Sequence, residues 1–240
     1  MVSVAQLNAI GADDFAALMA GPPAAATPWL RVAAQQGVPR AQAILAQRLL
    51  DGHGLQRDPH EALHWFRVAA ERDEVEAINM LGRCHQHGWG TSPDMAMAVY
   101  WYRLAAKRGD PWGMYNFANL LMSGLGIEAD RPAALAWYQK AAATGHAKAV
   151  NIVGRFFEEG WEVAPDAERA FDCYRMAAEG GDFRGQFNCA RVLLERGQVD
   201  AALDMIRRIP RSATPAFLHN LKGWLRSSGE QRLRDEADSI

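Results

Sequence analysis

The chain has 240 residues, of which 49% are hydrophobic, so it can bury a sizeable core, and its formal net charge is only −2. This near balance of charge argues against a nucleic-acid binder that works by neutralising phosphates, and against a basic protein held on a membrane surface. It has no apolar run of about 20 residues that could span a membrane, and its first residues lack the positive charge of a secretory signal, so we expect a cytoplasmic protein.

The first predicted element is an amphipathic helix from Val4 to Met19. A proline-rich link from Gly21 to Pro28 follows it, because proline interrupts the hydrogen bonding of a helix. We therefore expect residues 1–28 to form an N-terminal capping helix and a link. This segment would complete a degenerate first layer with the helix that carries Trp29.

The chain from Trp29 onward carries an internal repeat of 36 residues. Tryptophan marks the repeat at Trp29, Trp65, Trp101 and Trp137, and Cys173 stands one period later. The same period relates an aromatic column, Phe66, Tyr102, Tyr138 and Tyr174, and an aspartate column, Asp58, Asp94, Asp130 and Asp166. It also relates two glycine columns. The first contains Gly37, Gly109, Gly145 and Gly181, with Asp73 in this position once, and the second contains Gly54, Gly90 and Gly126, with Glu162 in this position once. A fixed period of this length indicates a stack of repeated units.

Each unit is predicted to hold two helices joined by a tight turn. A first helix, for example Trp112 to Ser123, ends at a glycine that can take a positive φ at little cost. The aspartate of the unit then caps the second helix by accepting from its free backbone N–H groups. The second helix runs to an alanine pair and ends at the next glycine. Small residues let neighbouring helices approach closely, while tryptophan and tyrosine fill the gaps between layers.

The C-terminal end departs from this pattern. The last unit has a first helix predicted from Gly185 to Arg196 and a second from Ala201 to Ile209. We place the repeat solenoid at residues 29–210. Residues 211–240 are expected to hold a capping helix, Thr214 to Arg226, followed by a polar tail that frays.

These columns resemble the Sel-1-like repeat family, a branch of the tetratricopeptide-like helical repeats. The resemblance rests on the small-residue and Leu–Gly start from Ala77 to Gly82, the turn Gly88-Trp89-Gly90, and the run from Asp94 to Gly109. It implies an all-α fold, a right-handed α/α superhelix of about five 36-residue helix–turn–helix repeats with degenerate end units. It also implies an adaptor or scaffold that binds a protein or peptide, and neither an enzyme nor a protein that needs a cofactor.

The same resemblance implies that the first helix of each unit lines a concave groove. Taking the small residue of each first helix as the contact between helices, we predict that the groove shows the residues three positions before it and one position after it. The predicted partner-binding residues are Asn79, Arg83, Tyr115, Asn119, Asn151, Arg155, Phe187 and Arg191, with Gln86, Trp112, Met122, Lys148, Glu158 and Arg184 nearby. Asparagine can pair with an extended backbone, arginine with carboxylates, and aromatic side chains can serve as apolar anchors. This set favours an extended segment with acidic side chains or a free C-terminal carboxylate, and ordinary solvated or intramolecular contacts are the alternative.

Residues typical of catalytic or metal sites are present only as isolated groups. Cys84, Cys173 and Cys189 have unrelated spacings and are interpreted as small buried thiols, and His85 within Cys84-His85-Gln86-His87 as a packed histidine. His60 and His64 are one helical turn apart and are interpreted as a solvated pair. We therefore predict no metal site and no catalytic residues.

Two other functions remain open beside the scaffold. A self-assembling structural repeat protein without a peptide ligand is the main alternative, and a hidden enzyme or metal protein is the other. Partner identity and oligomeric state do not follow from the repeat.

Overall fold

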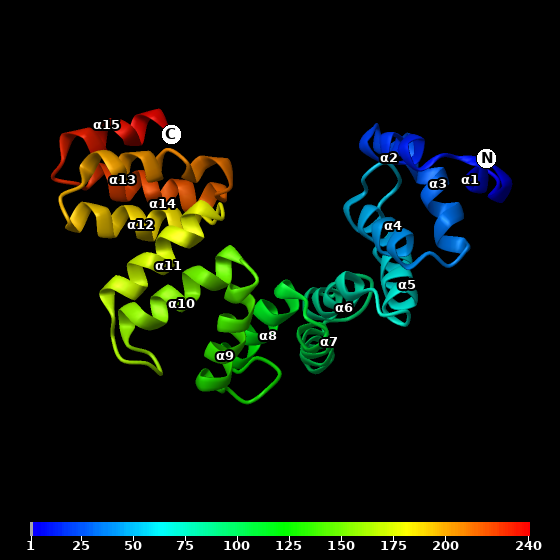
Figure 1. The fold of residues 1–240 in the computed structure, drawn as a ribbon, viewed down its shortest axis with the longest axis horizontal. Coiled ribbons are helices and arrows are strands. Elements are labelled where there is room, and N and C mark those ends of the chain that lie inside the picture. Colours follow the sequence, from blue (N-terminus) through cyan, green and yellow to red (C-terminus); the bar gives the residue numbers. More distant parts are fainter. Residues whose placement is uncertain (1) are drawn as a thin grey trace. The chain divides into compact units, whose positions relative to one another are not determined.

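The computed structural model describes residues 2–240, and every regular element among them is helical (Figure 1). The chain divides into two compact units, residues 1–130 and residues 131–240. The first contains α1 (Val4–Ala9), α2 (Ala12–Ala20), α3 (Pro23–Gln35), α4 (Pro39–Asp51), α5 (Pro59–Ala70), α6 (Val75–His87), α7 (Met95–Lys107) and α8 (Pro111–Ser123). The second contains α9 (Arg131–Ala143), α10 (Ala147–Glu159), α11 (Ala167–Glu179), α12 (Phe183–Glu195), α13 (Val199–Ile206), a 3-10 turn at Ile209–Arg211, α14 (Pro215–Arg226) and α15 (Gln231–Ser239).

The predicted helix starts and ends are confirmed within the repeat. The first helices α4, α6, α8 and α10 each end at a glycine in the left-handed region, with φ between 67° and 74°. The side chains of Asp58, Asp94 and Asp166 accept from backbone N–H groups in the first turns of α5, α7 and α11. These bonds satisfy donors that a helix leaves free at its N-terminus, so sequence chemistry alone fixes where these second helices begin.

Two positions keep the left-handed conformation without a glycine. Asp73 has a φ of 59° in the slot occupied elsewhere by Gly37, Gly109, Gly145 and Gly181. Glu162 has a φ of 58° in the slot of Gly54, Gly90 and Gly126. The turn geometry is therefore imposed by the stacking of the units, since a residue with a Cβ is disfavoured in this region.

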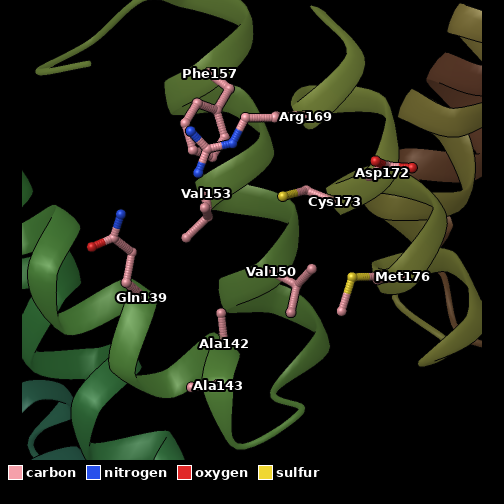
Figure 2. A pocket seen from close by; sticks show the side chains of 10 residues that line it. All are labelled: Gln139, Ala142, Ala143, Val150, Val153, Phe157, Arg169, Asp172, Cys173 and Met176. Carbon is pink, nitrogen blue, oxygen red and sulfur yellow. The ribbon is translucent and has the colours of Figure 1, made fainter. Parts of the chain in front are cut away.

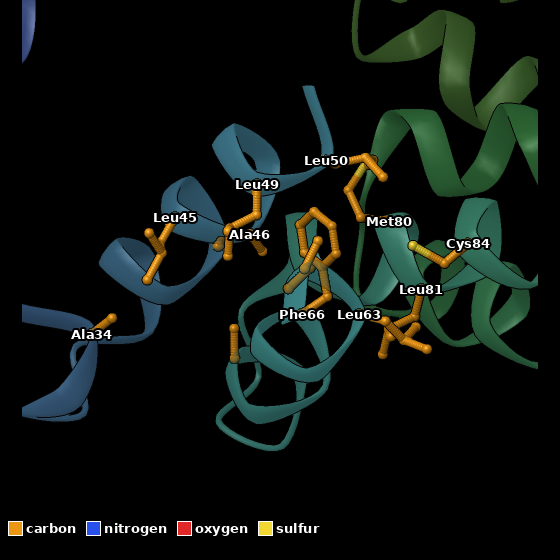
Figure 3. Close-up of a cluster of buried hydrophobic side chains, with 14 residues drawn as sticks. Ala34, Leu45, Ala46, Leu49, Leu50, Leu63, Phe66, Met80, Leu81 and Cys84 are labelled. Atoms are coloured by element: carbon orange, nitrogen blue, oxygen red, sulfur yellow. The ribbon is translucent and has the colours of Figure 1, made fainter. Parts of the chain in front are cut away.

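Apolar side chains from α3 to α6 form a core cluster in the first unit (Figure 3), and Leu30, Ala33 and Ala41 form a second, smaller one. Phe66 lies between Leu45 and Leu49 of α4 on one side and Met80 of α6 on the other. Trp65 and Trp101 pack against this cluster from outside and are only partly buried. Phe66 thus packs on both its own repeat and the next one, as is expected of repeats that bury their apolar faces by stacking.

In the second unit, Tyr174 of α11 occupies the core position that corresponds to Phe66 in the repeat. It is fully buried, and its hydroxyl donates to Oε2 of Glu158 over 2.6 Å. In the first unit, Tyr102 donates in the same way to Oε1 of Gln86 over 2.6 Å. The tyrosine column therefore joins the second helix of a repeat to the first helix before it, with a buried ring and a polar tip.

The N-terminal segment differs from its prediction. The amphipathic helix expected from Val4 to Met19 is broken between α1 and α2, and the link expected at residues 21–28 is mostly helix α3. Pro23 is compatible with α3 because it stands at the first helical position. Pro28 lies inside the helix, and the buried contacts of the neighbouring Ala26, Thr27 and Leu30 hold it there.

The C-terminal segment also differs. Helix α14 agrees with the predicted capping helix, and Thr214 caps it by accepting from the backbone N–H of Phe217. The expected fraying tail instead contains helix α15, which buries Leu233 and Ala237. Its Glu236 is almost fully buried and accepts from Arg207 of the α13 end over 2.9 Å, so the tail is held by both apolar and charged contacts. Among residues 2–240, none of the helices is both long enough and apolar enough to cross a membrane.

Candidate partner-binding surface

The predicted partner-binding residues lie on the first helices α6, α8, α10 and α12, as expected, but they are not equally accessible. Asn79 and Asn151 are buried, with 7% and 2% of their surface exposed. The side-chain amide of Asn116 donates to Oδ1 of Asn79 over 2.9 Å, and that of Asn188 donates to Oδ1 of Asn151 over 2.8 Å. The expectation that Asn79 and Asn151 are displayed in a groove is therefore wrong, because both side chains join successive first helices inside the protein.

Arg83 and Arg155 are held beside tryptophan rings. The guanidinium carbon of Arg83 lies 5.0 Å from the ring centroid of Trp89, and that of Arg155 lies 5.2 Å from Trp161. These distances are within the range of cation–π attraction. Arg155 is exposed, Arg83 is half-buried, and neither forms an ion pair with any carboxylate among residues 2–240. Two equivalent positions, two repeats apart, thus present a guanidinium beside an indole, and the charge of Arg155 also helps to lower the pKa of Glu158.

Arg191 differs, because carboxylates of the protein already bind it. It donates to Glu158 of α10 and, over 2.9 Å, to Glu195 of its own helix. Burial raises the pKa of Glu158, but the bonds from Tyr174 and Arg191 outweigh it, so the pKa lies below its ordinary value. Tyr174, Glu158 and Arg191 therefore form a charged network that connects α10, α11 and α12.

The predicted aromatic anchors are partly in contact with other aromatic rings. Trp112 is 46% exposed, and its ring meets that of the half-buried Tyr115 edge-on, with centroids 6.2 Å apart. Phe187 is half-buried between Phe217 and Trp224 of α14, at centroid distances of 5.7 and 5.1 Å. Helix α14 therefore covers Phe187, while Trp112 and Tyr115 remain partly open to solvent.

The other residues predicted near this surface have mixed environments. Asn119, Met122 and Lys148 are half-buried, and Arg184 is exposed with its guanidinium 4.5 Å from the ring of Phe183. Gln86 accepts the hydroxyl of Tyr102. Sequence reasoning missed Trp89 and Trp161, although both occupy the middle of the turn after a first helix and stand two repeats apart.

A shallow pocket lies beside Arg83 in the first unit. It measures about 340 Å³ and is lined by Gln47, Leu50, Asp51, Arg57, Arg83 and Trp89. Arg57 donates to the backbone carbonyl of Leu50, and Gln47 donates to Asp51 over 2.7 Å. The guanidinium of Arg83 and the indole of Trp89 thus border a hollow that opens to solvent.

The isolated cysteines and histidines are placed mostly as interpreted. Cys84 and Cys189 are buried and Cys173 is half-buried; burial raises the pKa of all three thiols, to about 12 for Cys84. His85 is buried, while His60 and His64 are exposed. Over residues 2–240, no group of three or more His, Cys, Asp or Glu side chains could hold a metal ion.

Comparison with known proteins identifies the repeat. The family model for the Sel1 repeat matches residues 39–74, 75–110, 113–146 and 147–182, which is four of the five predicted units and more than half of the chain. No curated protein matched the chain.

Solved structures agree with this match. A Sel1 repeat protein from Oxalobacter formigenes is 27% identical, with a TM-score of 0.80 over 95% of this chain and 99% of its own length. The protective antigen c5321 of uropathogenic Escherichia coli, which displays an SLR fold, is 27% identical with a TM-score of 0.68, over 90% of this chain and 48% of its own. The immunity protein Pa5087 of Pseudomonas aeruginosa is 18% identical with a TM-score of 0.56, over 82% of this chain and 80% of its own, and shows likeness of fold alone. The chain belongs to the Sel1 repeat family, an all-helical solenoid family whose members in general are scaffolds for protein–protein interaction and typically lack catalytic activity.

Proposed function

We propose that the chain is an interaction scaffold that binds an extended segment of a partner protein along its first helices. The partner would place an acidic side chain, or a free C-terminal carboxylate, on the guanidinium group of Arg83 in the first unit or of Arg155 in the second. The observation that carries this proposal is that both arginines lie against tryptophan rings and that, within the described chain, neither forms an ion pair with a carboxylate.

An ordered guanidinium is a good carboxylate receptor for two physical reasons. Its planar fork can form two parallel hydrogen bonds to a carboxylate. Contact with the indole also restricts the arginine before the partner arrives, so less side-chain entropy is lost on binding. The guanidinium of Arg191 already forms ion pairs with Glu158 and Glu195, so we assign Arg191 to the internal network and not to the binding of a partner.

The remaining predicted residues divide between contact and support. Trp112 and Tyr115 of α8 offer partly open aromatic surface for an apolar side chain of the partner. Asn119 belongs to the same helix. Asn79 and Asn151 would act indirectly, by fixing the spacing of the first helices from which the arginines project.

Affinity capture from a cell extract tests the proposal with two matched variants. The test variant is Arg83→Glu/Arg155→Glu. The control is Arg67→Glu/Arg103→Glu, which makes the same change in net charge at exposed positions of the second helices α5 and α7. We expect a discrete partner to bind the wild type and the control but not the test variant. Equal capture by both variants would contradict the proposal.

Self-assembly is the competing function, and exposed apolar side chains in the first unit give it a basis. Tyr100 and Leu125 are 49% and 54% exposed. Light scattering on the purified wild-type chain distinguishes the two functions. A concentration-dependent oligomer that captures no partner would replace the scaffold proposal with the structural one.

A further inference from the structure

The tryptophan column of the repeat has one gap, at Cys173. Trp29, Trp65, Trp101 and Trp137 all stand in this column of the second helices, and each is half-buried. Cys173 takes the same place in α11 and is much smaller. Replacing a large side chain by a small one in a packed repeat leaves a cavity unless the neighbours collapse into it.

The first unit shows what normally fills this place. Trp101 of α7 packs against the core cluster that contains Leu81 of α6, and Ala70 of α5 packs on the same cluster. Trp101 and Ala70, which belong to successive second helices, therefore pack on the same core cluster. Counting forward two repeats, Ala70 corresponds to Ala142, Leu81 to Val153 and Trp101 to Cys173.

In the second unit, the residues of these three columns are among those that line an open pocket. It measures about 430 Å³ and is bounded by three helices (Figure 2): Gln139, Ala142 and Ala143 of α9, Val150, Val153 and Phe157 of α10, and Arg169, Asp172, Cys173 and Met176 of α11. The sulfur of Cys173 points toward Val153, and Met176 reaches toward Val150 (Figure 2). The neighbours have not collapsed into the space that a tryptophan would occupy.

We propose that this pocket receives the indole side chain of a tryptophan from a partner polypeptide. Two of its wall residues, Ala142 and Val153, stand in the columns of Ala70 and Leu81, which share a core cluster with Trp101 in the first unit, so an indole suits the apolar side of the pocket. Its volume falls within the roughly 300–1,000 Å³ of typical ligand pockets. The guanidinium of Arg169 lies 4.0 Å from the ring centroid of Phe157 at the edge of the pocket, where it can also stack on an incoming ring.

The polar groups at the rim suit an indole better than an aliphatic side chain. An indole carries one N–H donor, and it needs an acceptor when its ring is buried. Gln139 supplies a side-chain oxygen to the pocket lining, and Asp172 supplies a carboxylate whose Oδ1 also accepts from Arg175 over 2.9 Å. Trp65 makes this kind of bond in the first unit, donating to Oε1 of Glu61 over 3.2 Å, whereas the buried Nε1 of Trp101 has no hydrogen-bond partner in the described chain. The proposed site lies mainly on second helices and does not depend on the arginine surface of the first helices.

The test uses the full chain and three probes: N-acetyl-tryptophanamide, N-acetyl-leucinamide and free indole. Binding is measured by saturation-transfer NMR and by protection of Cys173 from iodoacetamide, followed by mass spectrometry. The alkylation is run at alkaline pH because burial raises the pKa of this thiol. Cys84 and Cys189 are buried and serve as internal controls in the same sample.

Two variants separate pocket filling from loss of fold. Cys173→Ala keeps the pocket open, and Cys173→Trp fills it. We expect N-acetyl-tryptophanamide to bind both the wild type and Cys173→Ala. In the wild type, saturation with this probe should slow the alkylation of Cys173 about tenfold. The probe should bind Cys173→Trp at least tenfold more weakly than the wild type. A higher thermal midpoint of Cys173→Trp would show that its own indole occupies the pocket.

Three results would overturn the proposal. Equal affinity for N-acetyl-leucinamide would mean that the pocket takes any apolar group. Binding of free indole tenfold tighter than N-acetyl-tryptophanamide would mean that the ligand is a small molecule and not a side chain. Failure of N-acetyl-tryptophanamide to bind both the wild type and Cys173→Ala would remove the site altogether.

Discussion

Asn188 donates a hydrogen bond of 2.8 Å to Asn151, and this bond joins two successive first helices of the repeat. Asn116 makes the same bond to Asn79 in the other unit. The acceptors are buried and the donors half-buried, so each pair satisfies polar atoms that water reaches poorly. The pairs lie beneath the proposed binding surface and fix the spacing of the helices that form it.

Removing one donor of such a pair should be costly. In Asn188→Ala, Oδ1 of Asn151 stays buried without a partner, so we expect a loss of about 1–3 kcal/mol in the free energy of unfolding. Urea denaturation measures this loss. Asn220→Ala, at an exposed position of α14, is the control and should change the free energy of unfolding by less than about 0.5 kcal/mol. A similar small effect in both variants would mean that the asparagine pair contributes nothing to stability.

Glu162 should be replaceable by glycine with a gain in stability. Its φ of 58° is disfavoured for a residue with a Cβ, by roughly 1–2 kcal/mol, while the greater freedom of glycine in the unfolded chain returns part of that energy. Glu162→Gly is therefore expected to raise the free energy of unfolding by about 0.5–1 kcal/mol. Glu162→Ala keeps the Cβ and should give no gain. Stabilisation of the alanine variant to the same extent would assign the effect to the lost charge.

The Tyr174, Glu158 and Arg191 network should make stability depend on pH in the acid range. The pKa of Glu158 is lowered in the folded chain, so its contribution is present above its unfolded pKa and is lost as pH falls through the folded value. We expect Glu158→Gln to lose about 0.5–1 kcal/mol at pH 7 and to approach the wild type below about pH 4. Thermal unfolding of both proteins across this range measures the difference. A difference that stays constant with pH would show that the carboxylate charge is not involved.

Replacing Trp101 of the first unit by cysteine should create a pocket like the one beside Cys173 in the second unit. Trp101→Cys removes an indole that packs against the core cluster, and because Trp101 is only half-buried we expect a loss of about 2 kcal/mol, below the 3–5 of fully buried cases. Chemical denaturation measures the loss. The variant should also gain a second site for N-acetyl-tryptophanamide in saturation-transfer NMR. Unchanged stability would mean that Trp101 and Cys173 are not equivalent in packing.

The repeat could be predicted well because its signals are local. Glycine at a positive φ and aspartate at a helix N-cap act within a few residues, so Gly88 and Asp94 fix the ends of their helices wherever the chain lies. The failures at the chain ends have the opposite cause. Helix α15 is short and polar, and burial of Leu233 together with the ion pair between Glu236 and Arg207 determines its placement.

The candidate surface could be predicted only in part. The repeat period identifies the two columns to which Asn79 and Arg83 belong. It does not tell which of these side chains the next first helix will cover, and in the structure Asn116 of α8 covers Asn79. Likewise, the glycine before each of Trp89 and Trp161 was visible, but the contact of these tryptophans with Arg83 and Arg155 depends on how each turn folds back. The smaller residue at Cys173 was also visible, whereas the pocket beside it depends on the neighbouring helices not collapsing.

Titration of a fluorescein-labelled decaglutamate peptide, followed by fluorescence anisotropy at low and physiological salt, tests the central claim most directly. The account predicts binding to the wild type, equal binding to Arg67→Glu/Arg103→Glu, and at least tenfold weaker binding to Arg83→Glu/Arg155→Glu, because only the last variant removes the guanidinium groups held by tryptophan. Equal weakening in both variants would show that net charge alone governs binding, and absence of binding to the wild type would contradict the acidic preference itself.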